Sequence, residues 1–261
     1  MARKSQAPDI RSPLEQTLFD ITIQHLAKLE SYIPGPVKKA GKAKQELLQR
    51  YQQDPVFSIF GLDSAEYIAA ALSGGTITSI HRKLGDIYED SVAAIFAHSL
   101  GLAAEDIHYS ATIVVDDEPE TRSIDAYLPF DKLSPQIRSS VEAYCQGEIT
   151  KLTAQPKLQL IGAGLEVRHC YQTGDSKRAR ADLAMARHLF VSGILPLIPF
   201  FCSQSNRAVL SRYAGVWVVK EGMESYRLIS ELSGFDYHGF LVRNKESFRQ
   251  PVVKVLRSLT K

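Results

Sequence analysis

Cysteine is scarce in this sequence, and two common cysteine patterns are absent. The chain has three cysteines, Cys145, Cys170 and Cys202, and no Cys-x-x-Cys pair. An odd number of scattered cysteines predicts neither a disulfide framework nor a thiolate zinc site. We therefore expect reduced thiols, as in a cytoplasmic protein.

The sequence also lacks a segment that could enter a membrane. Residues 1–13 contain no apolar run of the kind that a secretory signal peptide needs. The most apolar stretch, residues 189–201, contains two prolines and is shorter than the roughly 20 residues that span a bilayer. We therefore expect no membrane partner.

An excess of charge of one sign is missing as well. The chain has 31 Lys and Arg against 29 Asp and Glu, and 44% of its residues are hydrophobic. This balance excludes a disordered or low-complexity chain and is typical of a soluble globular protein. At 261 residues, folding can remove about 75% of the unfolded surface from water, so the core needs no covalent or metal support.

The hydrophobic periodicity predicts helices and strands that alternate along most of the chain. Helical spacing covers residues 14–29, 64–72, 76–100, 134–149, 178–192, 206–213, 224–232 and 249–259. Strand patterns cover 109–115, 121–127, 158–161, 165–171, 194–201 and 216–219, with a turn at 116–120 and an interruption at the glycines of 162–164. This order predicts an α/β fold with a central mixed β-sheet flanked by helices and a helical N-terminal section. We expect two parts, 1–75 and 76–261, the second of which carries the function.

Residues 37–51 are rich in lysine, and this basic segment allows two interpretations. It is either a helix with a solvated face or an arm that contacts phosphates. In the second case the N-terminal part would contact DNA, and it could also take part in dimerisation.

Three carboxylates stand out by their positions in the expected elements. Asp125 follows the hairpin turn, Glu166 opens the strand 165–171, and Glu89 lies in the helix 76–100. Residues two apart in a strand share a face, so Arg168 is expected on the same side as Glu166. Two carboxylates at adjacent strand ends can hold Mg²⁺, and a neighbouring cation can stabilise charge that develops on a phosphate. The plainer interpretation is that Asp125 caps the turn and Glu166 only pairs with Arg168.

The order of these motifs resembles that of type II restriction endonucleases of the PD-(D/E)xK superfamily. Residues 164–177, GLEVRHCYQTGDSK, resemble the catalytic strand and following turn of these nucleases. Residues 78–89, TSIHRKLGDIYE, resemble the helix that carries a glutamate before the catalytic hairpin. Residues 222–226 and 232–236 have features of the ApaLI-like subgroup. The resemblance covers roughly residues 76–240.

The resemblance implies a restriction-endonuclease-like fold and Mg²⁺-dependent, site-specific cleavage of double-stranded DNA by a homodimer within a restriction-modification system. The family's metal-binding aspartate falls on Asp125, its second acidic ligand on Glu166 and its lysine on Arg168. Glu89 would be an extra ligand or would orient Arg168. Two positions depart from the pattern, because arginine cannot accept a proton from water and Ile124 stands where the family often has proline. A catalytically inactive or regulatory DNA-binding protein, and a base-excising or RNA-cleaving enzyme, remain alternatives.

Basic residues near these motifs are the expected DNA contacts. Lys177, Arg178 and Arg180 begin the helix after the catalytic strand, where they could contact phosphates or the edges of guanine. A solvated first helical turn is the plainer interpretation, although cations at a helix N-terminus oppose the helix dipole. Lys177 is also the nearest lysine that could replace the one missing at 168.

Two further expected contacts lie in the helix 76–100. His81 and Arg82 are adjacent there and could reach DNA. His169 alternates with Arg168 on the catalytic strand, so it points away from Glu166 and is expected to be structural.

Overall fold

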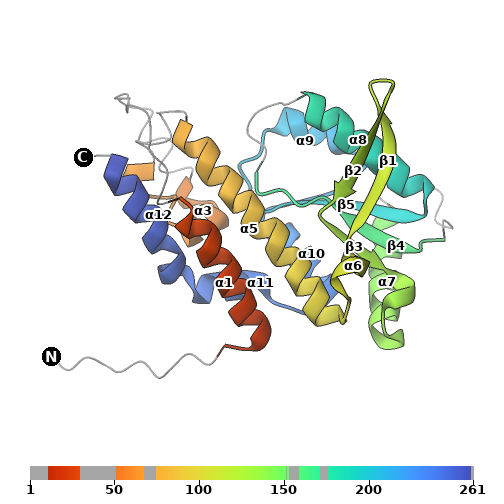
Figure 1. Ribbon diagram of the computed structural model, residues 1–261, viewed down its shortest axis with the longest axis horizontal. Coiled ribbons are helices and arrows are strands. Elements are labelled where there is room, and N and C mark those ends of the chain that lie inside the picture. The colour runs from red at the N-terminus through yellow and green to blue at the C-terminus, as the bar shows by residue number, and fades with distance from the viewer. Residues whose placement is uncertain are drawn as a thin grey trace.

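A helical half and a sheet-containing half lie side by side in the computed structural model (Figure 1). The structure describes residues 11–29, 51–67, 75–150, 152, 159–170 and 176–259. The basic segment expected over 37–51 therefore lies outside the described residues except for residue 51. Of the helix expected over 64–72, residues 64–67 are described, and 65–67 are helical.

The helical half contains α1 (Pro13–Ala27), α3 (Pro55–Ile59), α11 (Tyr237–Arg243) and α12 (Lys245–Leu259). The long helix α5 (Gly75–Leu100) runs between these helices and the sheet (Figure 1). α1 begins with a capping box between Ser12 and Glu15, and it packs against α5 and α12. Leu14, Leu18 and Leu26 of α1 are buried in the main core. A dimer contact through α1 would therefore have to use its polar face.

The sheet has four strands, and its strand directions are mixed. They are β3 (Ala126–Pro129), β4 (Gly162–Leu165), β5 (Ile194–Phe200) and β6 (Val218–Glu221), in that spatial order. β3 is antiparallel to β4, and the other pairs are parallel. This arrangement confirms the expected α/β fold with a helix-flanked mixed sheet.

Helices cover both faces of this sheet, which explains why β5 is apolar along its whole length. α8 (Ser176–Val191) and α9 (Arg207–Tyr213) share one buried cluster with Ile194, Ile198 and Phe200. α7 (Pro135–Ile149) and α10 (Met223–Ser233) share the main core with the alternate residues Leu195 and Leu197. Alternate residues of β5 thus pack into the two helical layers on opposite faces of the sheet.

A separate hairpin of β1 (Tyr109–Val115) and β2 (Glu118–Ile124) extends beyond the sheet beside α8 (Figure 1). Its turn is shorter than expected, because Asp116 and Asp117 both adopt positive φ, 51° and 66°, as a two-residue hairpin turn requires. The single strand expected over 121–127 is wrong. The chain breaks at Asp125, so that β2 belongs to the hairpin and β3 to the sheet.

The expected interruption at residues 162–164 is also wrong, because these glycines form β4. A Cβ atom on Gly162 would lie 2.7 Å from the carbonyl oxygen of Leu128, and one on Gly164 would lie 2.7 Å from Ile124 Cδ1. The glycines are therefore required by close neighbours within a strand, and they do not mark a turn.

Cys170 and Cys202 form a disulfide with a Cα–Cα distance of 5.4 Å, which contradicts the expectation of three reduced thiols. The two residues are 32 positions apart in sequence, and parallel pairing brings them together. The backbone N–H of Cys202 donates to the carbonyl oxygen of His169 at 2.9 Å. Cys145 is buried and unpaired.

The strand expected over 158–161 is wrong, because residues 159–161 lie outside any strand and β4 begins only at Gly162. The other elements follow the expectations with shifted ends. α12 begins at Lys245, earlier than expected, α11 was not expected, and β6 begins two residues late at Val218. α6 (Ala104–Ile107) and the 3-10 turn η1 (Phe130–Lys132) connect larger elements. Within the described residues, no helix combines the length and the apolar character that a membrane span requires.

Candidate functional site

Asp125 occupies the break between the hairpin and the sheet, and hydrogen bonds to β4 and the segment after it fix its position. Its backbone N–H donates to the carbonyl oxygen of Leu165 at 3.0 Å. Its Oδ2 accepts the backbone N–H of Val167 at 2.6 Å, across 42 residues of sequence. The strand break therefore directs the carboxylate toward the segment that follows β4.

That segment, residues 166–170, is an extension of β4 that stays hydrogen-bonded to β5 through an isolated bridge between Arg168 and Phe200. The strand expected over 165–171 is therefore wrong beyond Leu165, where β4 ends. The backbone N–H of Glu166 donates to Leu197 and that of Arg168 to Pro199, both at 3.0 Å. The strand alternation is kept, so Glu166 and Arg168 line the same cavity, as expected. His169 lies on the other side, with its ring stacked on Tyr88 of α5.

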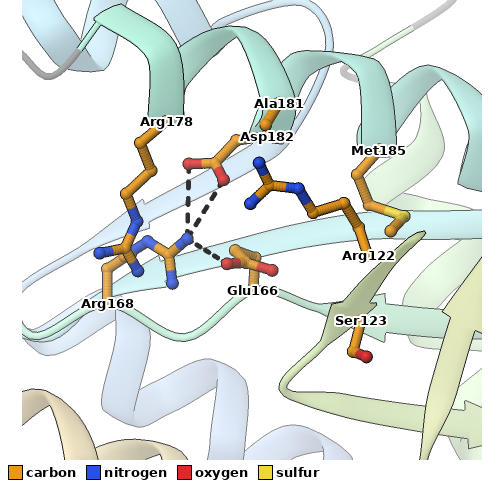
Figure 2. Close-up of a pocket in the computed structure, with 8 residues that line it drawn as sticks. All are labelled: Arg122, Ser123, Glu166, Arg168, Arg178, Ala181, Asp182 and Met185. Atoms are coloured by element: carbon orange, nitrogen blue, oxygen red, sulfur yellow. Dashed lines mark hydrogen bonds and ion pairs between the residues drawn. The ribbon is translucent and has the colours of Figure 1, made fainter. Parts of the chain in front are cut away.

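We call Asp125, Glu166, Arg168 and Asp182 the carboxylate–arginine cluster. Nη2 of Arg168 contacts Glu166 Oε1 and lies 3.3 Å from Asp182 Oδ1, and Nη1 lies 3.5 Å from Asp125 Oδ2. Only 6% of the Arg168 side chain is exposed. Figure 2 shows this guanidinium between the carboxylates of Glu166 and Asp182. A single buried cation thus joins three carboxylates from three different segments.

Sequence reasoning missed Asp182, which lies on α8, 14 residues after Arg168. Its Oδ2 accepts a hydrogen bond from the hydroxyl of Tyr213 at 2.8 Å, and its backbone carbonyl accepts one from Trp217 Nε1 at 3.2 Å. The signal was present, because Asp182 falls three residues before the buried Met185 on the apolar face of the helix. A carboxylate on an apolar helix face needs a buried partner.

Arg168 alone does not keep all the carboxylates of the cluster ionised at neutral pH. Burial raises the pKa of Asp125 to about 7 and that of Glu166 to about 8, although Arg168 opposes both shifts. Burial also raises the pKa of Glu89. Burial alone would lower the pKa of Arg168, but the charges of Glu166, Asp182 and Asp125 outweigh it and raise that pKa, so Arg168 stays protonated. A further cation would therefore stabilise the ionised carboxylates.

Two cavities share Arg168 and Arg178 as lining residues. The first has a volume of about 360 Å³ and includes the carboxylate–arginine cluster residues Glu166 and Asp182. The second has a volume of about 560 Å³ and faces α5, with Glu89 in its wall. Glu89 and Arg168 therefore line the same cavity.

The expected DNA contacts divide between these cavities and the outer surface. His81 and Arg82 line the second cavity, and Arg178 lines both. Arg180 instead pairs with Asp116 in the hairpin turn, with a distance of 2.8 Å between Nε and Oδ1. Lys177 lies in the first turn of α8, and its side chain is outside the described part of the structure.

The second cavity borders a group of buried rings that we call the histidine–aromatic cluster: Phe57, Tyr67, His81, Tyr88 and His169. The His169 ring stacks between His81, at a centroid distance of 5.0 Å, and Tyr88, at 5.8 Å. His81 Nε2 lies 3.0 Å from the hydroxyl of Tyr67. Burial lowers the pKa of His81 to about 4 and that of His169 well below its usual value. At neutral pH His81 is therefore uncharged, and the adjacent Arg82 is one of the three arginines that line this cavity.

The donor chemistry of the carboxylate–arginine cluster fits Mg²⁺, whereas its present arrangement does not enclose a metal. Carboxylate oxygens, here of Asp125 and Glu166, are the ligands that Mg²⁺ prefers. Among the described residues, no group of three or more histidine, cysteine, aspartate or glutamate side chains is arranged to hold a metal ion. The guanidinium of Arg168 lies where these carboxylates converge, so binding would require it to release at least one of them.

No known protein family, no curated protein and no solved structure matches this chain. Functional conclusions therefore come from the geometry of the carboxylate–arginine cluster and its two cavities.

Proposed function

We propose that this protein is a type II restriction endonuclease of the PD-(D/E)xK superfamily, with a restriction-endonuclease-like version of the mixed sheet. It would hydrolyse phosphodiester bonds at a specific sequence in double-stranded DNA and would require Mg²⁺. The observation that supports this proposal most is the meeting of Asp125 and Glu166 beside one buried arginine. Val167 directly follows Glu166 in the chain, and its backbone N–H donates to Asp125 Oδ2 at 2.6 Å.

Each residue has a defined part in this proposal. Asp125 and Glu166 would hold Mg²⁺, which supplies a Lewis acid and a bound water of lowered pKa when present. Arg168 stays protonated, so it would stabilise negative charge on the phosphate and would not act as a base. Glu89, across the second cavity, would orient Arg168 or add a ligand.

The remaining expectations belong to the same proposal. A homodimer would place two such sites on a palindromic DNA sequence. Arg82, Arg178 and Arg180 are exposed and would contact DNA, together with His81 as an uncharged contact and Lys177. A cytoplasmic location stays part of the proposal, but it loses the support of three reduced thiols because Cys170 and Cys202 are paired.

Plasmid cleavage with and without Mg²⁺ tests the proposal directly. We expect the wild type to give discrete double-strand products that require Mg²⁺. Glu166→Gln and Asp125→Asn should lower the cutting rate by about 10² or more while DNA is still bound, because each removes a charge from the metal site and keeps its shape. The matched control is Glu142→Gln, at an exposed glutamate that pairs with Arg138 on α7. Wild-type cutting by Glu166→Gln would refute the proposed site.

A catalytically inactive DNA-binding protein of the same fold is the second candidate. Arg168 favours it, because the guanidinium already neutralises part of the carboxylate charge that a metal would otherwise neutralise. The same assay separates the candidates. Retention of DNA without cutting at any Mg²⁺ concentration would support the second candidate, and abasic sites or cut RNA would instead indicate a base-excising or RNA-cleaving enzyme.

A further inference from the structure

The hairpin brings an additional arginine to the first cavity, and no sequence motif had drawn attention to it. Arg122 lies on β2, opposite Ala111 of β1, two residues before the hairpin ends. Arg122 and Ser123 line the cavity of about 360 Å³ together with Glu166 and Arg168. Figure 2 shows the Arg122 side chain extending from β2 over this cavity, toward Asp182.

Three arginines therefore line one small cavity, and they differ in how deeply they are buried. Arg168 is buried and holds the three carboxylates of the carboxylate–arginine cluster. Arg122 is only partly buried, with 38% of its side chain exposed, and Arg178 at the start of α8 is exposed. The two outer arginines come from different elements and face the cavity from opposite sides of Arg168 in Figure 2.

The ion pair of Arg122 with Glu120 is easily exchanged. Its Nε donates to Glu120 Oε2 at 2.9 Å, two residues earlier on the same strand. An ion pair of this kind, open to solvent, contributes little to stability. A phosphate offers the guanidinium a stronger, bidentate acceptor than a solvated carboxylate does. The hairpin could therefore give up this pair without loss of its fold.

We propose that the first cavity is a phosphate subsite in which Arg122 and Arg178 bind a phosphate group of the nucleic-acid strand, next to the bond that is cut. This inference rests on the proposed nuclease function and assigns part of its substrate contact to the hairpin. It makes Arg122 a positioning residue, because it acts on the strand beside Glu166 and not on the reacting atoms.

Binding of a duplex oligonucleotide, measured by fluorescence anisotropy at two salt concentrations without Mg²⁺, tests the subsite. Arg122→Ala should weaken binding about tenfold and reduce the salt slope by about one, since one phosphate contact is lost. Arg122→Lys should restore much of the affinity, because it keeps the charge. The control is Arg138→Ala, at an arginine of similar exposure (48%) that pairs with Glu142 on α7 and should leave binding unchanged. Thermal unfolding should be the same for all four proteins.

Inorganic phosphate distinguishes a strand phosphate from a free anion. Phosphate should displace the duplex from the wild type at lower concentration than from Arg122→Ala. If phosphate no longer displaces the duplex from Arg122→Ala, yet the variant binds the duplex as the wild type does, the cavity takes free phosphate. Our assignment to the strand is then wrong. Equal affinity and equal salt slope in wild type and Arg122→Ala would also overturn it.

The outcomes for the subsite and for the nuclease can be separated. If the wild type never cuts DNA, yet Arg122→Ala still weakens duplex binding, the subsite stands and the nuclease proposal fails. If the wild type cuts, Arg122→Ala should raise KM about tenfold with little change in kcat. Cutting by Arg122→Ala at wild-type KM would overturn the subsite and leave the nuclease proposal intact.

Discussion

The carboxylate–arginine cluster and the histidine–aromatic cluster lie on opposite sides of the same strand extension, and they bury ionisable groups in opposite ways. Arg168 keeps its charge because three carboxylates surround it. Its neighbour His169 loses its charge, because it is buried among rings and neither ring nitrogen has a hydrogen-bond partner in the structure. Two consecutive residues therefore belong to different sites, one that keeps a buried charge and one that excludes it.

The two clusters should also respond to pH in opposite directions. Asp125 and Glu166 have raised pKa values in the folded protein, so their stabilising contribution is complete at low pH and is lost as pH rises through about 7 and 8. His81 and His169 have lowered pKa values, so their contribution is complete above about pH 6.5 and is lost on acidification. The difference shows that burial alone does not decide the sign of a pH effect, since the charge type of the group matters.

Removal of Arg168 should have the largest effect on the difference between the two clusters, because it takes the buried cation out of the carboxylate–arginine cluster. Arg168→Ala would leave three carboxylates without their buried cation, and we expect a loss of about 3–5 kcal/mol in the free energy of unfolding at pH 7. Urea denaturation measures this loss. The control Arg138→Ala, in an exposed pair with Glu142, should change it by less than about 0.5 kcal/mol. A similar small effect for both variants would show that Arg168 does not hold the cluster together.

Loss of the disulfide should loosen both clusters together, because Cys170 ends the extension that carries them. For a loop closed across 32 residues, Cys202→Ser should cost about 4 kcal/mol in the free energy of unfolding. A thiol reductant should destabilise the wild type by a similar amount and leave Cys202→Ser unchanged. Alkylation of the unreduced, unfolded wild type followed by mass spectrometry should find one reactive thiol, that of Cys145. Three reactive thiols would contradict the disulfide.

Glu166→Gln should isolate the pH response of the carboxylate–arginine cluster. Because Glu166 loses stabilisation as pH rises from about 4.5 to about 8, the variant should gain stability relative to the wild type between pH 5 and pH 8. We expect a relative gain on the order of 2 kcal/mol, measured by urea denaturation in the presence of a chelator. A difference between the two proteins that does not vary with pH would contradict the raised pKa.

His169→Phe should isolate the opposite response with a smaller effect. The phenyl ring keeps the stacking between His81 and Tyr88 and removes two unpaired ring nitrogens. Since the wild type loses stability as pH falls below about 6.5, the variant should gain about 1 kcal/mol over it between pH 7.5 and pH 5. Thermal or urea unfolding at both pH values measures this gain. The control is His98→Gln, at an exposed histidine of α5, and it should show no such gain.

Local patterns predicted the elements whose hydrophobic periodicity indicates which of their residues are buried. The helical period over 76–100 agrees with α5, the β-rich run 109–115 agrees with β1, and the apolar run 194–201 agrees with β5. The alternation of Glu166, Arg168 and His169 was also predicted correctly, because it needs only the two-residue repeat of a strand. Such features depend on spacing along the chain.

Contacts between distant segments were the part that local patterns could not predict. The glycines of β4 looked like a turn, since their requirement comes from Leu128 and Ile124 on neighbouring segments. Asp182 and the pairing of Cys170 with Cys202 were missed for the same reason.

By itself, the sequence determined which residues are apolar, which can be charged and which face of each element they share, because these properties are local and periodic. It thereby determined the helix-flanked mixed sheet and placed Glu166 beside Arg168. The tertiary structure alone decided that the chain breaks at Asp125 and that Asp182 reaches Arg168. It also decided that Arg122 faces the same cavity. These outcomes follow from the register between strands and the packing of α8, where hydrogen bonds and close contacts join residues that lie far apart along the chain.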